Sequence, residues 1–219
     1  MIICIQQVLP LAQRNELRQL LSGSRFIDGK ATAGWHAREV KNNVQLSADE
    51  SSVGTDTAIV SKALMGHELF RMAARPKALS PILFSKYLQG MHYGTHVDDA
   101  FMGEMRSDLS YTLFLNDPAS YEGGELVMDQ AVGEQAFKLE AGDLILYPST
   151  TLHRVEMVSS GERMAAVGWI QSRIRSNEQR ELLFDLESAR LSLYAREGKS
   201  AEFDLLSKSF SNLLRMWGE

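Results

Sequence analysis

Three side chains that could bind a metal ion stand out in the sequence: His96, Asp98 and His153. His96 and Asp98 are two residues apart at the end of an aromatic-rich strand pattern, and side chains two apart on a strand point the same way. His153 follows the apolar run at 144–148 and lies on a second predicted strand. We therefore expect two imidazoles and one carboxylate to converge on one point.

Such a ligand set has a specific chemical use. Two imidazoles and a carboxylate on one face of an octahedron leave three positions open, as in non-haem Fe(II) oxygenases. The open positions admit a co-substrate and dioxygen together, which a closed tetrahedral site does not. Two alternatives stay open: a jelly-roll metalloenzyme that uses zinc or manganese without an oxoacid, and a binding protein without turnover.

Arg163 lies ten residues after His153, just past a predicted turn that ends at Gly161. With a three-residue hairpin loop and a left-handed Gly161, Met157 pairs with Arg163. His153 then pairs with Val167, and His153 and Arg163 share a face. The separation of about 13 Å along the strand suits a small dicarboxylic acid between metal and guanidinium. Arginine can bind a carboxylate through two parallel hydrogen bonds; the alternative is a solvated turn residue.

Composition bounds the remaining possibilities. The 219 residues include 23 basic and 28 acidic side chains, a net charge of -5, which argues against nucleic acid as a partner. The single cysteine, Cys4, excludes an intramolecular disulfide and indicates a cytoplasmic protein. We expect Cys4 to be buried in a first strand. No apolar stretch is long enough to predict a membrane span.

Three regions must position these residues, with predicted boundaries at 1–78, 79–172 and 173–219. In the first, helices are predicted at 11–21, after Pro10, and at about 56–73, and the polar stretch between them has loops of unassigned form. In the second, short apolar runs separated by turn signals predict a sandwich or barrel of jelly-roll type.

The third region is predicted to form two helices separated by Gly198. Their apolar residues recur at helical spacing, so each helix has one apolar face. The hairpin could cover the chain's own sheet or mediate homo-oligomerisation. We expect it to pack on the sheet, because amphipathic helices usually cover their own core.

The sequence resembles the Fe(II)- and 2-oxoglutarate-dependent dioxygenases, specifically their prolyl-hydroxylase-like branch. The resemblance rests on His96-Val97-Asp98, His153 and Arg163, and on the preceding Tyr87-x-x-Gly90-x-x-Tyr93. More narrowly, the whole chain is similar to bacterial PKHD-type hydroxylases. The segments that carry this likeness are Ala31-Thr32-Ala33-Gly34, Gly90 to Asp98, Arg106-Ser107-Asp108-Leu109-Ser110 and Trp169-Ile170-Gln171-Ser172.

The resemblance implies an α+β, mainly β, fold: a double-stranded β-helix (jelly roll) with flanking N-terminal helices and a C-terminal helical hairpin. It implies Fe(II) on His96, Asp98 and His153, 2-oxoglutarate with its far carboxylate on Arg163, O2, and L-ascorbate as reductant. Tyr87 is predicted as second anchor of that carboxylate, and Phe114 stands where some relatives have a tyrosine.

The implied reaction hydroxylates a C–H bond and yields succinate and CO2. The implied substrate is a prolyl or lysyl residue of a peptide, or a small molecule. Three aromatic residues, Tyr93, Phe101 and Trp169, are candidates for the entrance of the site. His92 shares the face of His96, and could touch substrate, only if no bulge intervenes.

Overall fold

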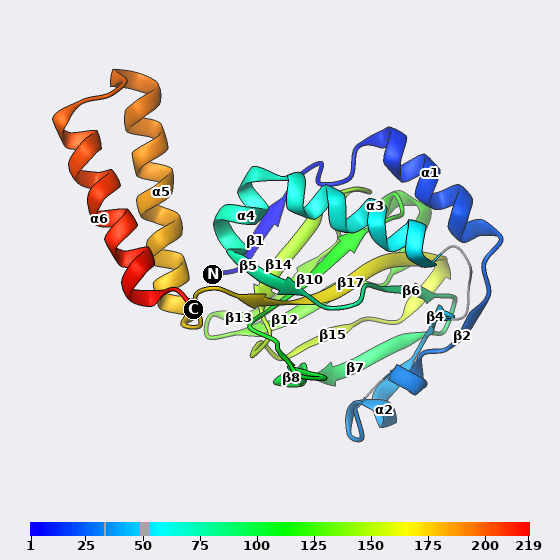
Figure 1. Cartoon of the computed structure of the whole chain (residues 1–219). Helices are drawn as coiled ribbons and strands as arrows, with labels where there is room; N and C mark the ends of the chain where they lie inside the picture. The colour runs from blue at the N-terminus through cyan, green and yellow to red at the C-terminus, as the bar shows by residue number, and fades with distance from the viewer. Residues whose placement is uncertain (33, 49–52) are drawn as a thin grey trace.

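The core consists of two facing antiparallel sheets (Figure 1). The computed structural model describes residues 1–32, 34–48 and 53–219, so Ala33 of the quoted motif lies outside the described residues. The larger sheet has the strand order β1-β14-β10-β17-β6-β4-β2, with β5 also paired to β17. Its strands are β1 (Ile3–Ile5), β2 (Phe26–Asp28), β4 (Val44–Leu46), β5 (Pro76–Leu79), β6 (Leu83–Tyr87), β10 (Leu109–Phe114), β14 (Leu144–Pro148) and β17 (Arg163–Ser172).

The smaller sheet has the order β13-β12-β15-β7-β3 and contains both histidines of the predicted site. Its strands are β3 (Lys41–Asn42), β7 (His92–His96), β12 (Leu126–Gln130), β13 (Gly133–Phe137) and β15 (His153–Val155). Two small pairs complete the described strands: β8 (Phe101–Met102) with β9 (Met105–Arg106), and β11 (Tyr121–Gly123) with β16 (Val158–Gly161). The predicted jelly-roll core is confirmed.

Helices cover the outer face of the larger sheet (Figure 1). They are α1 (Leu11–Ser22), α3 (Val53–Gly66) and α4 (Glu68–Ala74), while α2 (Ala37–Val40) and the 3-10 turns η1 (Gly29–Thr32) and η2 (Pro118–Ser120) lie in connections. The single helix predicted at 56–73 is wrong, because extended backbone at His67 (φ -82°, ψ 119°) separates α3 from α4.

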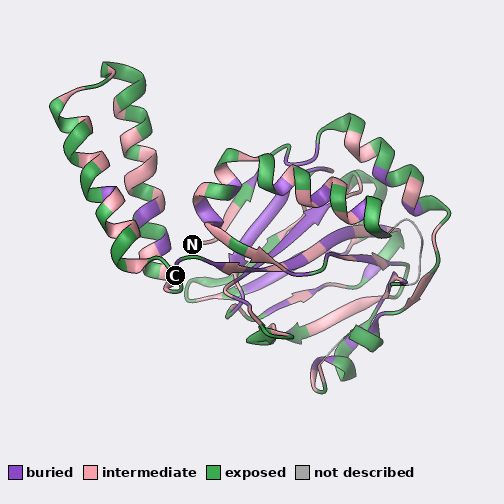
Figure 2. Ribbon diagram, in the orientation of Figure 1, coloured by how far each residue is buried: buried purple, intermediate pink, exposed green. Residues whose placement is uncertain are grey.

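Strand alternation distributes β10 between two apolar clusters and the cavity. Tyr111 and Leu113 pack with the helices, whereas Phe114 joins the cluster between the sheets. Ser110 and Thr112 face the cavity between the sheets. Figure 2 shows how burial concentrates in these central strands. The alternation of side chains along β10 thus points the polar residues of this fully buried strand into the cavity between the sheets.

The predicted hairpin between His153 and Arg163 is wrong. His153 lies on β15 in the smaller sheet and pairs with His96 and Met128. Arg163 begins β17 in the larger sheet and pairs with Tyr87. Gly161 has the expected positive φ, +76°, but the strand that it ends, β16, pairs with β11. The chain crosses between sheets here, so sequence neighbours face each other across the core instead of side by side.

The C-terminal hairpin consists of α5 (Asn177–Glu197) and α6 (Ala201–Trp217), separated at Gly198 as predicted. It stands away from the sheet rather than covering it (Figure 1), so that expectation is wrong. The two helices bury Leu183 and Phe210 against each other in a cluster of their own. An ion pair between Arg75 and Glu187, 2.6 Å long, connects α5 with the end of α4.

Cys4 is exposed, contrary to expectation. It lies on β1 at the edge of the larger sheet, and alternation buries Ile5 while turning the Cys4 side chain outward. The first strand is therefore only half covered.

Candidate metal centre

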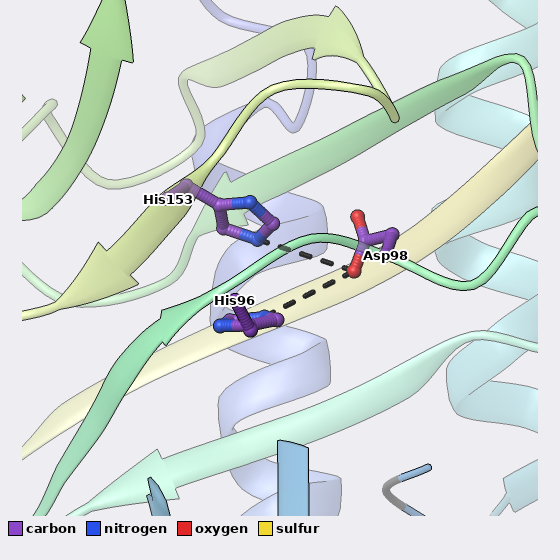
Figure 3. A group of neighbouring side chains, drawn as sticks. All are labelled: His96, Asp98 and His153. Atoms are coloured by element: carbon purple, nitrogen blue, oxygen red, sulfur yellow. Dashed lines mark ion pairs between the residues drawn. The ribbon is translucent and has the colours of Figure 1, made fainter. Parts of the chain in front are cut away.

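His96, Asp98 and His153 lie together, with their rings and carboxylate turned toward one another (Figure 3). The Nε2 atoms of both histidines are 4.0 Å from Oδ1 of Asp98. The two ring centroids are 4.2 Å apart. Within the described parts of the chain, this is the one group of three or more such ligands close enough to share an ion.

Strand pairing accounts for this convergence. His96 pairs with His153, and Asp98 follows two residues beyond the end of β7. The next pair is Tyr93 with Val155, so β7 has one residue more than β15 between the two pairs. This bulge turns Tyr93 into the cavity, where its ring stacks on His96 at 3.7 Å. Because of this bulge, His92 does not share the strand face of His96, and it is not among the residues that line the cavity.

The histidine tautomers fit a bound cation. Nδ1 of His96 lies 2.9 Å from the carbonyl oxygen of Gly94, and Nδ1 of His153 lies 3.0 Å from that of Thr151. A carbonyl can only accept, so each Nδ1 carries the proton and each Nε2 presents a lone pair toward Asp98. Burial, and then the neighbouring His153, lower the pKa of His96 to about 4. The ligand is thus neutral near neutral pH, as metal binding requires.

Asp98 is held by a residue that the sequence interpretation did not assign. Ser110 Oγ donates a hydrogen bond of 2.5 Å to Asp98 Oδ2 and lies 2.8 Å from Ser149 Oγ. This contact leaves Oδ1 directed at the histidines. The available sequence signal was the alternation of Ser110 and Thr112 with larger side chains along this strand, because a buried hydroxyl needs a partner.

Arg163 lies in the same cavity and is 1% exposed. Its guanidinium carbon is 5.1 Å from the ring centroid of Tyr87 and 5.4 Å from that of Phe114. Tyr87, the predicted second anchor, is therefore adjacent to Arg163. No carboxylate among the described residues lies within ion-pair distance of the guanidinium. A buried cation without a protein counter-ion is costly, which suits an anionic ligand.

The cavity is also lined by polar residues from β3, from β4 and from the connection between them, a stretch for which the sequence predicts loops of unassigned form. Lys41, Asn43 and Gln45 are buried and alternate with more exposed neighbours along β3 and β4. That alternation of polar residues was the available signal. The empty space at this site, counted out to the open solvent at its mouth, is about 820 Å³. Tyr93 and Trp169 line it, whereas Phe101 does not and is exposed.

Two family models match the chain. That of the 2OG-Fe(II) oxygenase superfamily matches residues 82–171, and that of the PKHD-type hydroxylase C-terminal domain matches residues 177–219. None of the helices in the described ranges combines the length and apolarity that crossing a bilayer requires.

Solved structures share the fold at low identity. A prolyl-4-hydroxylase of Pseudomonas putida has a TM-score of 0.54 at 19% identity, covering 78% of this chain and 92% of its own. A Trichoplax adhaerens prolyl hydroxylase, solved with a hypoxia inducible factor peptide fragment, has a TM-score of 0.60 at 15% identity, covering 83% and 86%. At these identities the likeness concerns the fold alone.

Curated relatives match over their whole length. A PKHD-type hydroxylase of Acaryochloris marina is 52% identical over 219 residues, and one of Synechococcus elongatus is 54% identical over 223. Both alignments cover 100% of this chain and 100% of the relative. Identity of this extent, together with the two matching family models, means that the chain belongs to the PKHD-type hydroxylases of the 2OG-Fe(II) oxygenase superfamily.

Proposed function

We propose that His96, Asp98 and His153 hold Fe(II), and that Arg163 binds the distal carboxylate of 2-oxoglutarate beside Tyr87. By its family the protein is a 2-oxoglutarate-dependent hydroxylase. One observation carries the residue assignment. The cavity that contains the three facing ligand atoms also contains a buried guanidinium with no carboxylate partner in the described chain.

Each residue then has a defined task. When bound, Fe(II) supplies the activation of O2 that couples decarboxylation of 2-oxoglutarate to hydroxylation of a C–H bond, with succinate and CO2 as products. The backbone carbonyls behind His96 and His153 fix the Nε2 lone pairs toward the metal. The two sheets and the ring of Tyr87 exclude water from the carboxylate that Arg163 binds.

We infer a peptide or small-molecule substrate, with a prolyl or lysyl residue as the first candidates. A peptide is supported by the fold likeness to a prolyl hydroxylase solved with a peptide fragment. A cytoplasmic location, L-ascorbate as reductant and oligomerisation through α5 and α6 stay predictions. The family matches at 82–171 and 177–219 support the predicted regions 79–172 and 173–219, and the region 1–78 stays a prediction.

Anaerobic spectroscopy tests the use of 2-oxoglutarate. We expect 2-oxoglutarate to change the absorption spectrum of the Fe(II)-loaded protein, and succinate to form when O2 is admitted. No spectral change would favour the alternative, a jelly-roll metalloenzyme that does not use the oxoacid. A spectral change without succinate would favour a binding protein that lacks turnover.

Replacing Ser110 with alanine tests the support of Asp98. We expect Ser110→Ala to weaken Fe(II) binding by roughly 10- to 100-fold, because the carboxylate loses the hydrogen bond that orients it. Succinate formation at saturating Fe(II) should change less. Metal titration with and without 2-oxoglutarate measures both, and the exposed Ser159 provides the control Ser159→Ala. Equal metal affinity in the two variants would contradict the role of Ser110.

A further inference from the structure

Lys41 is a second buried cation in the cavity, and the roles described above do not use it. It lies on β3, the edge strand of the smaller sheet, and is 5% exposed. Its Nζ donates a hydrogen bond of 3.1 Å to Thr32 Oγ1. Among the residues with described positions, it has no carboxylate within ion-pair distance.

The surroundings of Lys41 fix its direction and leave donors free. The single hydroxyl proton of Thr32 lies within reach of Gln45 Oε1 and of the carbonyl oxygen of Gly29, so Thr32 Oγ1 accepts from Lys41 with a lone pair. Gln45 Nε2 in turn donates to Ser85 Oγ at 3.2 Å. The hydrogen bond to Thr32 uses one of the three ammonium protons of Lys41. The other contact of Nζ, with the Tyr93 ring whose centroid is 5.1 Å away, is a cation–π contact and takes up no hydrogen-bond acceptor. Lys41 therefore has hydrogen-bonding capacity left for a ligand in the cavity.

Asp98 does not serve as the missing counter-ion. Its Oδ2 accepts from Ser110, and its Oδ1 faces the two histidines. Burial lowers the pKa of Lys41 to about 8, although Asp98 and then Asp28 oppose this effect. A buried ammonium in this situation is stabilised when an anion enters the cavity beside it.

Lys41 and Arg163 reach the cavity from different sheets and have different neighbours. Arg163 extends from β17 against the rings of Tyr87 and Phe114. Lys41 extends from β3 beside Tyr93, whose ring stacks directly on His96. Lys41 and the proposed metal ligand His96 thus contact the same aromatic ring. Two cations with separate surroundings can bind two different anions.

We propose that Lys41 binds a carboxylate of the substrate, so that the substrate class is an organic acid or a peptide whose carboxylate lies near the oxidised carbon. The proposal rests on the function proposed above, in which Arg163 binds 2-oxoglutarate. Lys41 would orient the substrate beside His96 through charge and two hydrogen bonds, without taking part in the oxidation.

Matched pairs of carboxylates and amides test this proposal on the full-length protein. Protein loaded with Mn(II) and 2-oxoglutarate is titrated calorimetrically, without O2, with acetate, N-acetylglycine and N-acetylproline and with their neutral amides. We expect at least one carboxylate to bind wild-type protein about tenfold or more tightly than its amide. Lys41→Met and Lys41→Gln should abolish the preference and Lys41→Arg should retain it, while Lys77→Met, at an exposed strand lysine, should leave it unchanged.

The affinity for 2-oxoglutarate separates the sources of the carboxylate. We expect Lys41→Met and Lys41→Gln to bind 2-oxoglutarate as wild type does. A loss of about tenfold would assign the Lys41 contact to the co-substrate and overturn the proposal. Equal binding of every acid and its amide to wild-type protein, which requires no variant, would also overturn it. Failure of wild-type protein to bind 2-oxoglutarate would instead refute the proposed function.

Discussion

Asp98→Ala is expected to lower succinate formation to below about a thousandth of the wild-type rate. This loss is larger than the roughly 10- to 100-fold loss that is typical when a residue that hydrogen-bonds to a metal ligand is removed. Oδ1 of Asp98 is the atom that faces both histidines, at 4.0 Å from each Nε2. Its removal leaves the two imidazoles without the anionic ligand. His96→Ala should have a comparable effect. Succinate per protein, measured with added Fe(II), gives the rate, and metal analysis gives the bound iron.

Asp129 offers a matched control for Asp98. It is an exposed aspartate on β12 of the same smaller sheet and does not line the cavity. We expect Asp129→Ala to keep wild-type iron content and succinate formation. If Asp98→Ala retained both as well, the assignment of Asp98 as a metal ligand would be refuted.

Arg163→Ala is expected to raise the 2-oxoglutarate concentration needed for half-maximal turnover by about 30-fold or more, while the protein still binds iron. None of the carboxylates in the described ranges lies within ion-pair distance of the buried guanidinium, so 2-oxoglutarate would be its counter-ion. Losing a buried charged contact costs roughly 2 to 5 kcal/mol of binding. The measurement is the 2-oxoglutarate dependence of succinate formation, together with metal analysis.

Two further variants separate this effect from a packing defect. Arg163→Met keeps most of the side-chain length between the rings of Tyr87 and Phe114 and should also bind 2-oxoglutarate weakly. Arg154 lies next to His153 but pairs with Glu134 and Glu156 outside the cavity, so Arg154→Met should behave as wild type. Loss of iron from Arg163→Ala to the same extent as from Asp98→Ala would contradict the role of Arg163.

Local patterns predicted much of the fold. Leu17 and Leu21 have helical spacing and do pack from α1 onto the sheet. Gly198 separates the last two helices, and its φ of +69° is one that glycine readily adopts. The break at His67 was missed, because α3 and α4 both present apolar residues to the same core and the periodicity across them looks continuous.

Pairing between strands that are distant in the sequence was harder to predict from the sequence. Pairing between strands adjacent in the sequence would put His153 and Arg163 side by side, whereas the jelly roll sends β15 and β17 to different sheets. Arg163 and His153 still reach one cavity, because facing sheets bring inward side chains together. They do so from opposite sheets and not from a shared strand face.

The sequence by itself determined which donor atoms are available and that His96 and Asp98, two residues apart, lie close together. It also determined the strand and helix periodicities, because these depend on neighbouring residues. Only the tertiary structure decided that a bulge turns Tyr93 inward, that Ser110 holds Asp98, and that Lys41 joins the cavity. These features depend on register and sheet order, which are fixed by packing between residues far apart in the chain.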